Sequence, residues 1–509
     1  MRQQTLQACA VALLFVCGVP IGSAAGQVSG PVAPTATAAD ADAEAVARIQ
    51  AGITALRLQI EALPQDGRTT ADTVAALRSQ LAALEIQLAS YGGGSGAPAQ
   101  AAPPAQPLPT PLQKELGQDL QIDFDDLRGD QFSVPRIFNR PIDPTRANFI
   151  DLPGTDAGFQ IGGYAKLDML FDPRLAGNPD KFVSSTIPVD VPDDGQYGNF
   201  NVHARQTRFQ LNFIKGTQKS VGGPLRFFLE ADFFGGDGQL AFRMRHAYGS
   251  KANVVAGFTW SALTDVDAFP DTLDFEMVPG TTQNRQPQFR YTHPFDTEGK
   301  TSLAFSVEKP TVDVTLLEET NVVTRYPDVI VRFRHYWGGG HIQPGVAFRS
   351  LGASDRTTTT DTAFGIVGLA AAGFTVFGSD FVGGGIVGGR GAAHYISNIQ
   401  GLGLDAAINV PEREIEPLNS FGAYATYKHN WTDRLRSSAN YGFDDVEDNA
   451  LLPLSSIANN QVFSVNLIFK FVPAATAGVE YMWGDNQLQS GEDGWAQRLQ
   501  IALKYDLTK

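Results

Sequence analysis

The amino-acid sequence predicts an all-β transmembrane barrel of about 16 antiparallel strands, preceded by an α-helical coiled-coil segment. Apolar residues recur with a period of two from residue 158 onward, and with steps of three and four between residues 40 and 90. After the N-terminal 25 residues, no uninterrupted apolar run approaches the roughly 20 residues of a membrane-spanning helix. If the chain crosses a membrane, it therefore crosses as strands.

The first 25 residues are typical of a secretory signal peptide. Arg2 supplies the positive charge, residues 8–19 form a short apolar core, and residues 23–25 (Ser-Ala-Ala) form a small-residue cleavage site. Both cysteines, Cys9 and Cys17, lie inside this segment. The mature protein is therefore expected to contain no disulfide and no cysteine-ligated metal.

Residues 40–90 show the apolar seam of a coiled coil in two segments, interrupted at residues 64–67 (Pro-Gln-Asp-Gly). The seam positions are Val46, Ile49, Ile53, Leu56, Ile60 and Leu63, then Val74, Leu77, Leu81, Leu84 and Leu88. Two geometries fit, a helical hairpin or one oligomeric coil with a break. Isoleucine at both kinds of seam position favours trimers or higher oligomers. An amphipathic helix pair packed on a neighbouring domain is the alternative, since each segment holds only about two heptads.

Residues 91–157 connect this segment to the barrel. Residues 91–111 form a Gly/Ala/Pro linker with little to bury, and residues 112–157 are interpreted as an extended lead-in.

The barrel is predicted over residues 158–509. Alternation is clear in Phe209, Leu211 and Phe213 against Arg208, Gln210 and Asn212. A soluble β-sandwich also alternates, but runs of about ten residues match tilted membrane strands. Aromatic residues near strand ends fit an interfacial girdle, and short connections such as residues 234–238 and 471–473 fit periplasmic turns. The aromatic positions are Tyr336, Trp337, Tyr481, Trp483 and Trp260. Residues 351–410 fit strands, a long loop or both.

Composition and motifs exclude several function classes. The net charge of -15 would repel a phosphate backbone, so no nucleic-acid partner is expected. The chain has no G-x-S-x-G, H-E-x-x-H or Walker sequence, and residues 383–390 resemble a phosphate-binding loop only in glycine content. His335 and His341 are the closest histidine pair and flank a predicted turn. We therefore expect no enzyme activity, no cofactor and no metal site.

Charged residues at the inward-facing positions of the predicted strands are mostly basic. If apolar positions face lipid, the alternate positions face the lumen. Fewer acids fall at inward positions, while Asp265, Asp267, Asp271, Asp274 and Glu276 are expected in loops. The candidate lumen-lining residues are Arg208, Arg226, Arg243, Arg245, Arg290, Arg332, Arg334 and Arg349.

Such a lumen favours anions, because guanidinium offers a rigid fork to carboxylate or phosphate. The steps Arg243/Arg245 and Arg332/Arg334 place two arginines on one strand face, as a short ladder. The alternative is that lumen arginines pair with nearby acids and brace the barrel.

Three blocks of sequence resemble the DcaP-like trimeric porins of Gram-negative outer membranes. They are residues 152–155 leading into Gly162–Asp168, residues 182–189 (FVSSTIPV) and residues 205–209 (RQTRF). The resemblance implies a sixteen-stranded barrel, a homotrimer, and diffusion of small anionic solutes such as dicarboxylates. It also implies that the coiled coil lies in the periplasm.

The function predicted from the sequence is an outer-membrane porin for passive diffusion of small anionic solutes, with outer-membrane lipid as its surroundings. A sugar- or nucleoside-type channel would instead show a line of aromatic residues along the lumen. A structural barrel that anchors the envelope and conducts little is the third hypothesis. Residues 112–157 or 351–395 are candidates for a plug or constriction loop.

Overall fold

A computed structural model describes residues 149–192, 195–216, 221, 223–236, 240–315, 321–354, 360–409 and 414–507. The predicted signal peptide (1–25), the predicted coiled coil (40–90) and the linker up to residue 148 lie outside the described residues. In the part of the chain that the structure describes, no helix is long and apolar enough to span a membrane.

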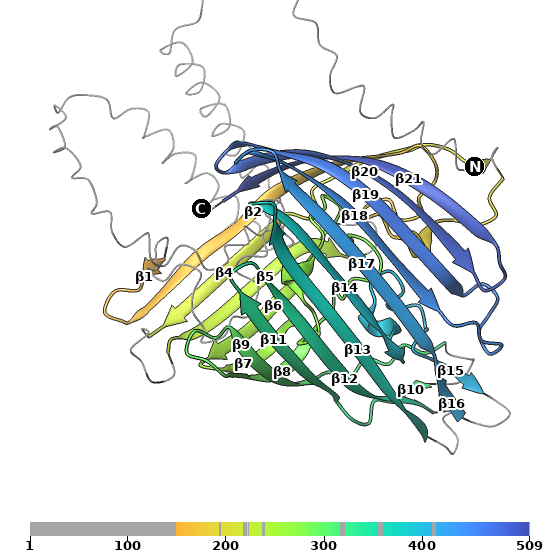
Figure 1. Ribbon diagram of the computed structural model, residues 1–509, viewed down its shortest axis with the longest axis horizontal. Coiled ribbons are helices and arrows are strands. Elements are labelled where there is room, and N and C mark those ends of the chain that lie inside the picture. Colours follow the sequence, from red (N-terminus) through yellow and green to blue (C-terminus); the bar gives the residue numbers. More distant parts are fainter. Residues whose placement is uncertain are drawn as a thin grey trace, which may run out of the picture. The chain divides into compact units, whose positions relative to one another are not determined.

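The described residues form a closed barrel of 16 antiparallel strands, as predicted (Figure 1). The ring closes because the last strand pairs with the first, Leu167 opposite Leu503. In order around the barrel, the strands are β2 (Ala157–Asp172), β3 (Asn199–His203) together with β4 (Arg208–Lys215), β5 (Leu225–Gly235), β6 (Ala241–Lys251), β7 (Val254–Trp260), β8 (Arg285–Pro294), β9 (Thr301–Glu308), β11 (Asp328–Trp337), β12 (Gly340–Ser354), β13 (Thr360–Val376), β14 (Asp380–Arg390), β17 (Asn419–Asn430), β18 (Leu435–Val446), β19 (Ile457–Val472), β20 (Ala475–Leu488) and β21 (Asp493–Asp506).

Shorter elements complete the sheet. The segments β3 and β4 share one place in the ring, since β4 pairs with the first half of β2 and β3 with its second half. The two-residue strands β1 (Ile150–Asp151) and β10 (Asn321–Val322) extend β2 and β12, and β15 (Ala406–Asn409) pairs with β16 (Glu414–Pro417) as a separate hairpin. Three single 3-10 turns lie in the connections, η2 (Ser184–Thr186), η4 (Val266–Ala268) and η5 (Ala393–Tyr395).

The barrel wall is apolar outside and polar inside. On β2, Ile161, Leu167 and Phe171 are exposed, whereas the alternate residues Lys166 and Asp168 are buried. A water-soluble protein has the opposite arrangement, because the hydrophobic effect favours the burial of apolar side chains. The wall of this protein has the arrangement of a barrel whose outer face contacts lipid.

The two ends of the barrel differ. At one end, called here the short-turn end, neighbouring strands are joined by a few residues, such as residues 338–339 between β11 and β12. At the opposite, long-loop end lie the connections 173–198, 261–284 and 391–405. Exposed Phe295, Phe377, Trp431 and Tyr505 lie at the short-turn end, as expected for an interfacial girdle.

One predicted turn is on the wrong end. The glycine-rich residues 234–238 were expected to form a periplasmic turn, but β5 runs from the short-turn end to the long-loop end. β5 therefore ends, at Gly235, on the side of the barrel where the long loops lie. The prediction was wrong because it took a short connection as a sign of the periplasmic end. Short connections can also occur at the end of the barrel where most of the long loops lie. The turn at residues 473–474 between β19 and β20 does lie at the short-turn end.

The ambiguous residues 351–410 contain both strands and a loop. The strands β13 and β14 form a regular hairpin in register from Ile366–Arg390 to Val376–Asp380. The β14–β15 loop, residues 391–405, then folds into the barrel, where Tyr395 and Ile396 are fully buried. Glycine and alanine obscured the alternation in the sequence, because small residues suit either face.

Candidate functional site

The β7–β8 loop, residues 261–284, folds into the lumen and crosses it. It is attached first to the β11–β12 side of the wall. Arg334 Nη2 donates to Asp265 Oδ1 over 3.0 Å and also to Asp267, and His341 Nε2 lies 2.9 Å from Asp265 Oδ2. Burial alone would raise the pKa of Asp265, but Arg334 and His341 outweigh it and hold that pKa below its ordinary value. The carboxylate thus stays charged and fastens the loop.

The far half of the loop is held by the opposite wall. The backbone N–H groups of Leu273 and Asp274 donate to Glu480 Oε2 over 2.6 and 2.8 Å. Lys166 Nζ donates to the Leu273 carbonyl over 2.7 Å. Arg436 Nε donates to Asp271 Oδ2 over 2.8 Å. Because both ends are fastened to different walls, the loop spans the lumen and forms a constriction.

Glycines let the loop approach the wall closely. A Cβ on Gly442 of β18 would lie 2.2 Å from the Pro279 carbonyl oxygen, and one on Gly422 of β17 would lie 2.7 Å from the Gly280 Cα. Gly280 itself has a φ of +76°, a conformation that glycine adopts without strain. The loop backbone therefore lies directly against these two strands.

The other inward loops pack on this one. The Phe182 N–H donates to Asp274 Oδ2 over 3.0 Å, and the Thr281 and Ser397 hydroxyls are 2.7 Å apart. Together the loops bury an apolar cluster against the inner face of β12–β14, which includes Leu263, Val367 and Val387. Since this side of the interior is packed, the remaining space lies toward the arginine-bearing strands β4–β8.

A cavity of about 30 Å³ lies between the constriction loop and that wall. From the wall it is lined by Arg208, Arg245 and Arg285, and from the loop by Asp274 and Phe275, among other residues. Burial raises the pKa of Asp274. The cavity therefore joins three cations to one carboxyl group.

Most of the predicted lumen arginines are paired with acids. All eight point inward, and all but the half-exposed Arg243 are buried. The distances between guanidinium nitrogens and carboxylate oxygens are Arg208–Glu230 3.6 Å, Arg243–Asp232 2.7 Å, Arg245–Glu230 2.7 Å, Arg334–Asp265 3.0 Å, Arg349–Asp328 3.2 Å and Arg349–Asp405 2.8 Å. The step Arg243/Arg245 is thus neutralised by Glu230 and Asp232, which is the bracing network weighed as the alternative.

Three predicted arginines are outside these pairs. Arg226 Nε donates to Asn212 Oδ1 over 2.9 Å. Arg290 and Arg332 have no carboxylate oxygen within 4.0 Å among the described residues. The structure thus places five of the candidates in ion pairs and Arg226 in a hydrogen bond with Asn212, whereas Arg290 and Arg332 have no ion pair among the described residues.

The placement of the acids corrects the charge argument. Asp265, Asp267, Asp271 and Asp274 were expected in loops and were not counted with the inward charges, yet the loop that carries them is inside the barrel and all four are buried. The alternation rule counts only strand residues, so it missed a loop that folds inward. The lumen is consequently less basic than the strands alone indicate.

Arg285 was not among the predicted residues. It is the first residue of β8 and lies off the inward alternation of Gln286, Gln288 and Arg290, although it faces the cavity. Its Nη1 is buried and has no hydrogen-bond partner among the described residues, and its guanidinium carbon lies 4.6 Å from the Trp260 ring centroid. Alternation fails at strand ends, so the pattern gave no signal for this residue.

Trp260 also differs from its predicted role. It was assigned to the interfacial girdle, but only 4% of it is exposed and it lines the cavity opposite Phe269. Its indole Nε1 is buried without a hydrogen-bond partner in the described part of the chain. Trp260 pairs with Arg285 across β7 and β8, so both turn inward where these strands end.

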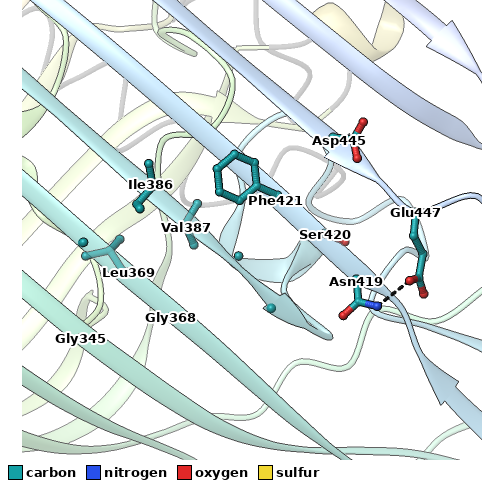
Figure 2. Close-up of a pocket in the computed structure, with 13 residues that line it drawn as sticks. Gly345, Gly368, Leu369, Ile386, Val387, Asn419, Ser420, Phe421, Asp445 and Glu447 are labelled. Carbon is teal, nitrogen blue, oxygen red and sulfur yellow. Dashed lines mark hydrogen bonds between the residues drawn. The ribbon is translucent and has the colours of Figure 1, made fainter.

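A larger cavity, of about 550 Å³, lies elsewhere in the wall (Figure 2). It is formed by small residues such as Gly368 and Gly388 between the exposed side chains of Ile386 and Phe421. None of the lumen arginines lines it. Two of its lining residues are hydrogen-bonded to each other, with Asn419 Nδ2 donating to Glu447 Oε2 over 2.5 Å. Because its apolar lining belongs to β12–β18, it is separate from the constriction.

Within the described ranges, no three His, Cys, Asp or Glu side chains are grouped as metal ligands. The polar groups that converge on the constriction cavity are mainly N–H donors of arginine, tryptophan and glutamine. Donors of this kind stabilise an anion.

The family model described as DcaP outer membrane protein matches residues 160–360, so the predicted resemblance is confirmed. The channel DcaP of Acinetobacter baumannii is 20% identical with a TM-score of 0.61, over 71% of this chain and 100% of that one. OmpF of Salmonella typhi is 12% identical with a TM-score of 0.46, over 70% and 100%. OmpT of Vibrio cholerae is 12% identical with a TM-score of 0.42, over 71% and 100%. No curated protein sequence matches.

Proposed function

We propose that this chain, which matches the DcaP outer membrane protein family over residues 160–360 and shares the fold of a DcaP channel, is an outer-membrane porin that favours small anions. Solutes would pass between the constriction loop and the wall of β4–β8 by diffusion, and we expect no catalysis. Dicarboxylates are the solutes that the family resemblance implies.

The observation that supports anion preference is a pair of buried N–H donors in the constriction cavity. Arg285 presents a buried Nη1 without a hydrogen-bond partner among the described residues, and Trp260 presents an indole N–H in the same state. An unsatisfied buried donor is unfavourable, and a charged one more so. A carboxylate that passes through the cavity can accept hydrogen bonds from both N–H groups and so stabilises them. A cation cannot accept these bonds and is repelled by the guanidinium.

The aromatic residues of the cavity do not favour a sugar channel. The Phe275 ring centroid lies 5.2 Å from the Arg243 guanidinium carbon and 5.3 Å from that of Arg245. Guanidinium groups that cover an aromatic face in this way leave less of it for a sugar ring. The arrangement supports charged solutes over neutral ones.

The test is single-channel recording of the refolded chain in a planar bilayer, under a KCl gradient. A reversal potential displaced toward the chloride equilibrium potential is expected. Displacement toward the potassium potential would contradict anion preference while leaving the porin assignment intact.

A barrel that conducts little is favoured by one observation, the size of the cavity. About 30 Å³ accommodates one small group, and three loops occupy the lumen. Absence of conductance in the same recordings would support this structural role in the envelope.

Assembly and topology complete the proposal. We expect a homotrimer, and conductance steps in groups of three would support it. The described chain enters β2 at the short-turn end, and short turns face the periplasm in barrels of this kind. Residues 40–90 are accordingly proposed to form a periplasmic coiled coil.

A further inference from the structure

Two inward-facing arginines of the wall form no ion pair with an acid among the described residues. Arg290 on β8 is 4% exposed and Arg332 on β11 is 8% exposed. For neither of them is a hydrogen bond or an ion pair with another described residue found, and Nε of Arg332 is a buried donor without a partner. Two guanidinium groups are thus removed from water without a carboxylate in ion-pair contact among the described residues.

The two arginines flank a single strand. Arg290 pairs with Ser306 of β9, and Arg332 pairs with Ala304 of the same strand. Both β9 residues face inward and are small, so they leave room between the longer side chains. Both arginines face the same side of the sheet across β9, and the charge of Arg290 is unfavourable for the charged form of Arg332. Their convergence is therefore unfavourable unless an anion lies between or beside them.

The acids nearest to the pair are already engaged. Glu308, the acid whose charge acts on Arg290, accepts hydrogen bonds from the Ala262 N–H over 2.8 Å and from Gln286 Nε2 over 2.6 Å. Asp265, on the side of Arg332, is bound by Arg334 and His341. Glu308 and Asp265 thus serve to hold the constriction loop and its surroundings.

The pair lies further along the path than the constriction cavity. Arg285 is at the long-loop end of β8, and Arg290 is five residues nearer the short-turn end. At about 3.4 Å per residue, this separation is roughly 17 Å along the strand. An anion that has passed Arg285 would meet Arg290 and Arg332 next.

We propose that Arg290 and Arg332 form a second binding site for a small oxyanion, of the carboxylate, sulfate or phosphate class, on the short-turn side of the constriction. Two guanidinium forks match the oxygen pairs of such anions. This inference rests on the proposed function for its role in transport. Binding itself is testable without transport.

The first experiment measures binding by thermal unfolding of the refolded full chain in detergent, followed by loss of β-sheet circular dichroism. An Arg285→Gln background removes the guanidinium of the constriction cavity that no described acid pairs with, and sulfate is compared with chloride at equal ionic strength. In that background we expect a saturable, sulfate-specific rise in Tm. The rise should disappear when Arg290→Gln and Arg332→Gln are added, and persist when Arg226→Gln is added instead.

An unchanged sulfate response in the Arg290→Gln, Arg332→Gln variant would overturn the proposal. Sulfate also stabilises folded proteins by exclusion from their surface, which the Arg226→Gln control measures. If the double variant fails to fold, Arg332→Lys is used instead, since lysine keeps the positive charge but lacks the bidentate geometry of guanidinium. This substitution should raise the half-saturating sulfate concentration about tenfold, as expected when one good hydrogen bond is lost.

The second experiment measures sulfate block of single-channel chloride current. The half-blocking concentration should rise by at least about tenfold in the Arg290→Gln, Arg332→Gln variant. An unchanged half-blocking sulfate concentration would show that the site does not lie on the path of the transported ions. Cation selectivity of the unmodified channel would contradict the proposed function, yet the Tm response to sulfate would still report the site.

Discussion

At the scale of single residues, the interior is a set of arginines sorted by whether an acid lies beside them. Arg245 and Arg349 each contact two carboxylates and hold parts of the structure together. Arg285 contacts the Trp260 ring and faces the constriction cavity. Neutralised arginines brace the barrel because their charge is already compensated. Arginines that no acid neutralises are the ones expected to act on a solute.

Arg285 is therefore expected to contribute more to selectivity than its neighbours. Arg285→Gln should lower the chloride-to-potassium permeability ratio about fivefold, which corresponds to about 1 kcal/mol. The measurement is the reversal potential under a KCl gradient. Arg434→Gln, which removes the same charge from an exposed turn, is the control. Equal effects of the two substitutions would show that the ratio follows overall charge and not the constriction.

At the scale of elements, the β7–β8 loop decides the shape of the lumen. It is fastened by ion pairs on one wall and by backbone hydrogen bonds on the other. Its closest approach to the barrel is at glycines of β17 and β18. A loop held in this way is a rigid part of the pore, and its position is sensitive to small additions at the contact.

Gly442→Ala tests that contact. The added Cβ would lie 2.2 Å from the Pro279 carbonyl oxygen, so the loop must move away from β18 toward the arginine-bearing wall. We expect the free energy of unfolding to fall by about 1–3 kcal/mol and the single-channel conductance to decrease. Gly339→Ala, where nothing lies within 4 Å of an added Cβ, should change neither. Unaltered conductance in Gly442→Ala would indicate that the loop does not limit the passage.

The β14–β15 loop carries a buried histidine that should make stability depend on pH. Burial lowers the pKa of His394 to about 4, from 6.5. The unfolded chain therefore binds more protons than the folded one between pH 6.5 and pH 4, and stability rises with pH across this window. The loss from pH 7.5 to pH 5 should be about 2 kcal/mol.

Thermal unfolding across that pH range checks this effect. His394→Gln should remove most of the loss, since glutamine does not titrate. His293→Gln, which replaces an exposed histidine on the outer face of β8, should leave the pH dependence as it is. A slope that survives in His394→Gln would assign the effect to other groups.

At the scale of the whole molecule, the chain carries a net charge of -15 while its constriction cavity is lined by three arginines. Selectivity should thus depend on local charge and not on the net charge. Fixed charges in contact with electrolyte are screened over about 10 Å at 0.1 M salt and about 3 Å at 1 M.

The chloride preference should accordingly decrease as the mean KCl concentration rises from 0.1 M to 1 M. Reversal potentials recorded at a constant concentration ratio measure this decrease. A preference that stays constant across this range would favour selection by tight binding at buried donors over selection by the field of the pore.

Local periodicity predicted the barrel, a strand number of sixteen to eighteen, and which arginines alternate with the apolar positions of the strands. These follow from a period of two, because successive side chains of a strand face opposite sides. The DcaP resemblance was likewise readable from three short blocks. The acids that pair with the arginines could not be predicted from the sequence. Arg334 and Asp265, for example, are 69 residues apart and come into contact only because a loop folds into the lumen.

Tertiary structure alone decided the constriction. Residues 261–284 have no strand alternation, so no pattern assigned them to the lumen, and four of their acids were placed outside it. Arg285 and Trp260 turn inward at strand ends, where the chain leaves the sheet and alternation no longer applies. The strands of the barrel wall can thus be predicted from the local sequence pattern. The charge balance of the interior depends instead on which loops, far away in the sequence, fold into the lumen. That balance is set by packing across the lumen, because a loop is held there by contacts to several strands at once.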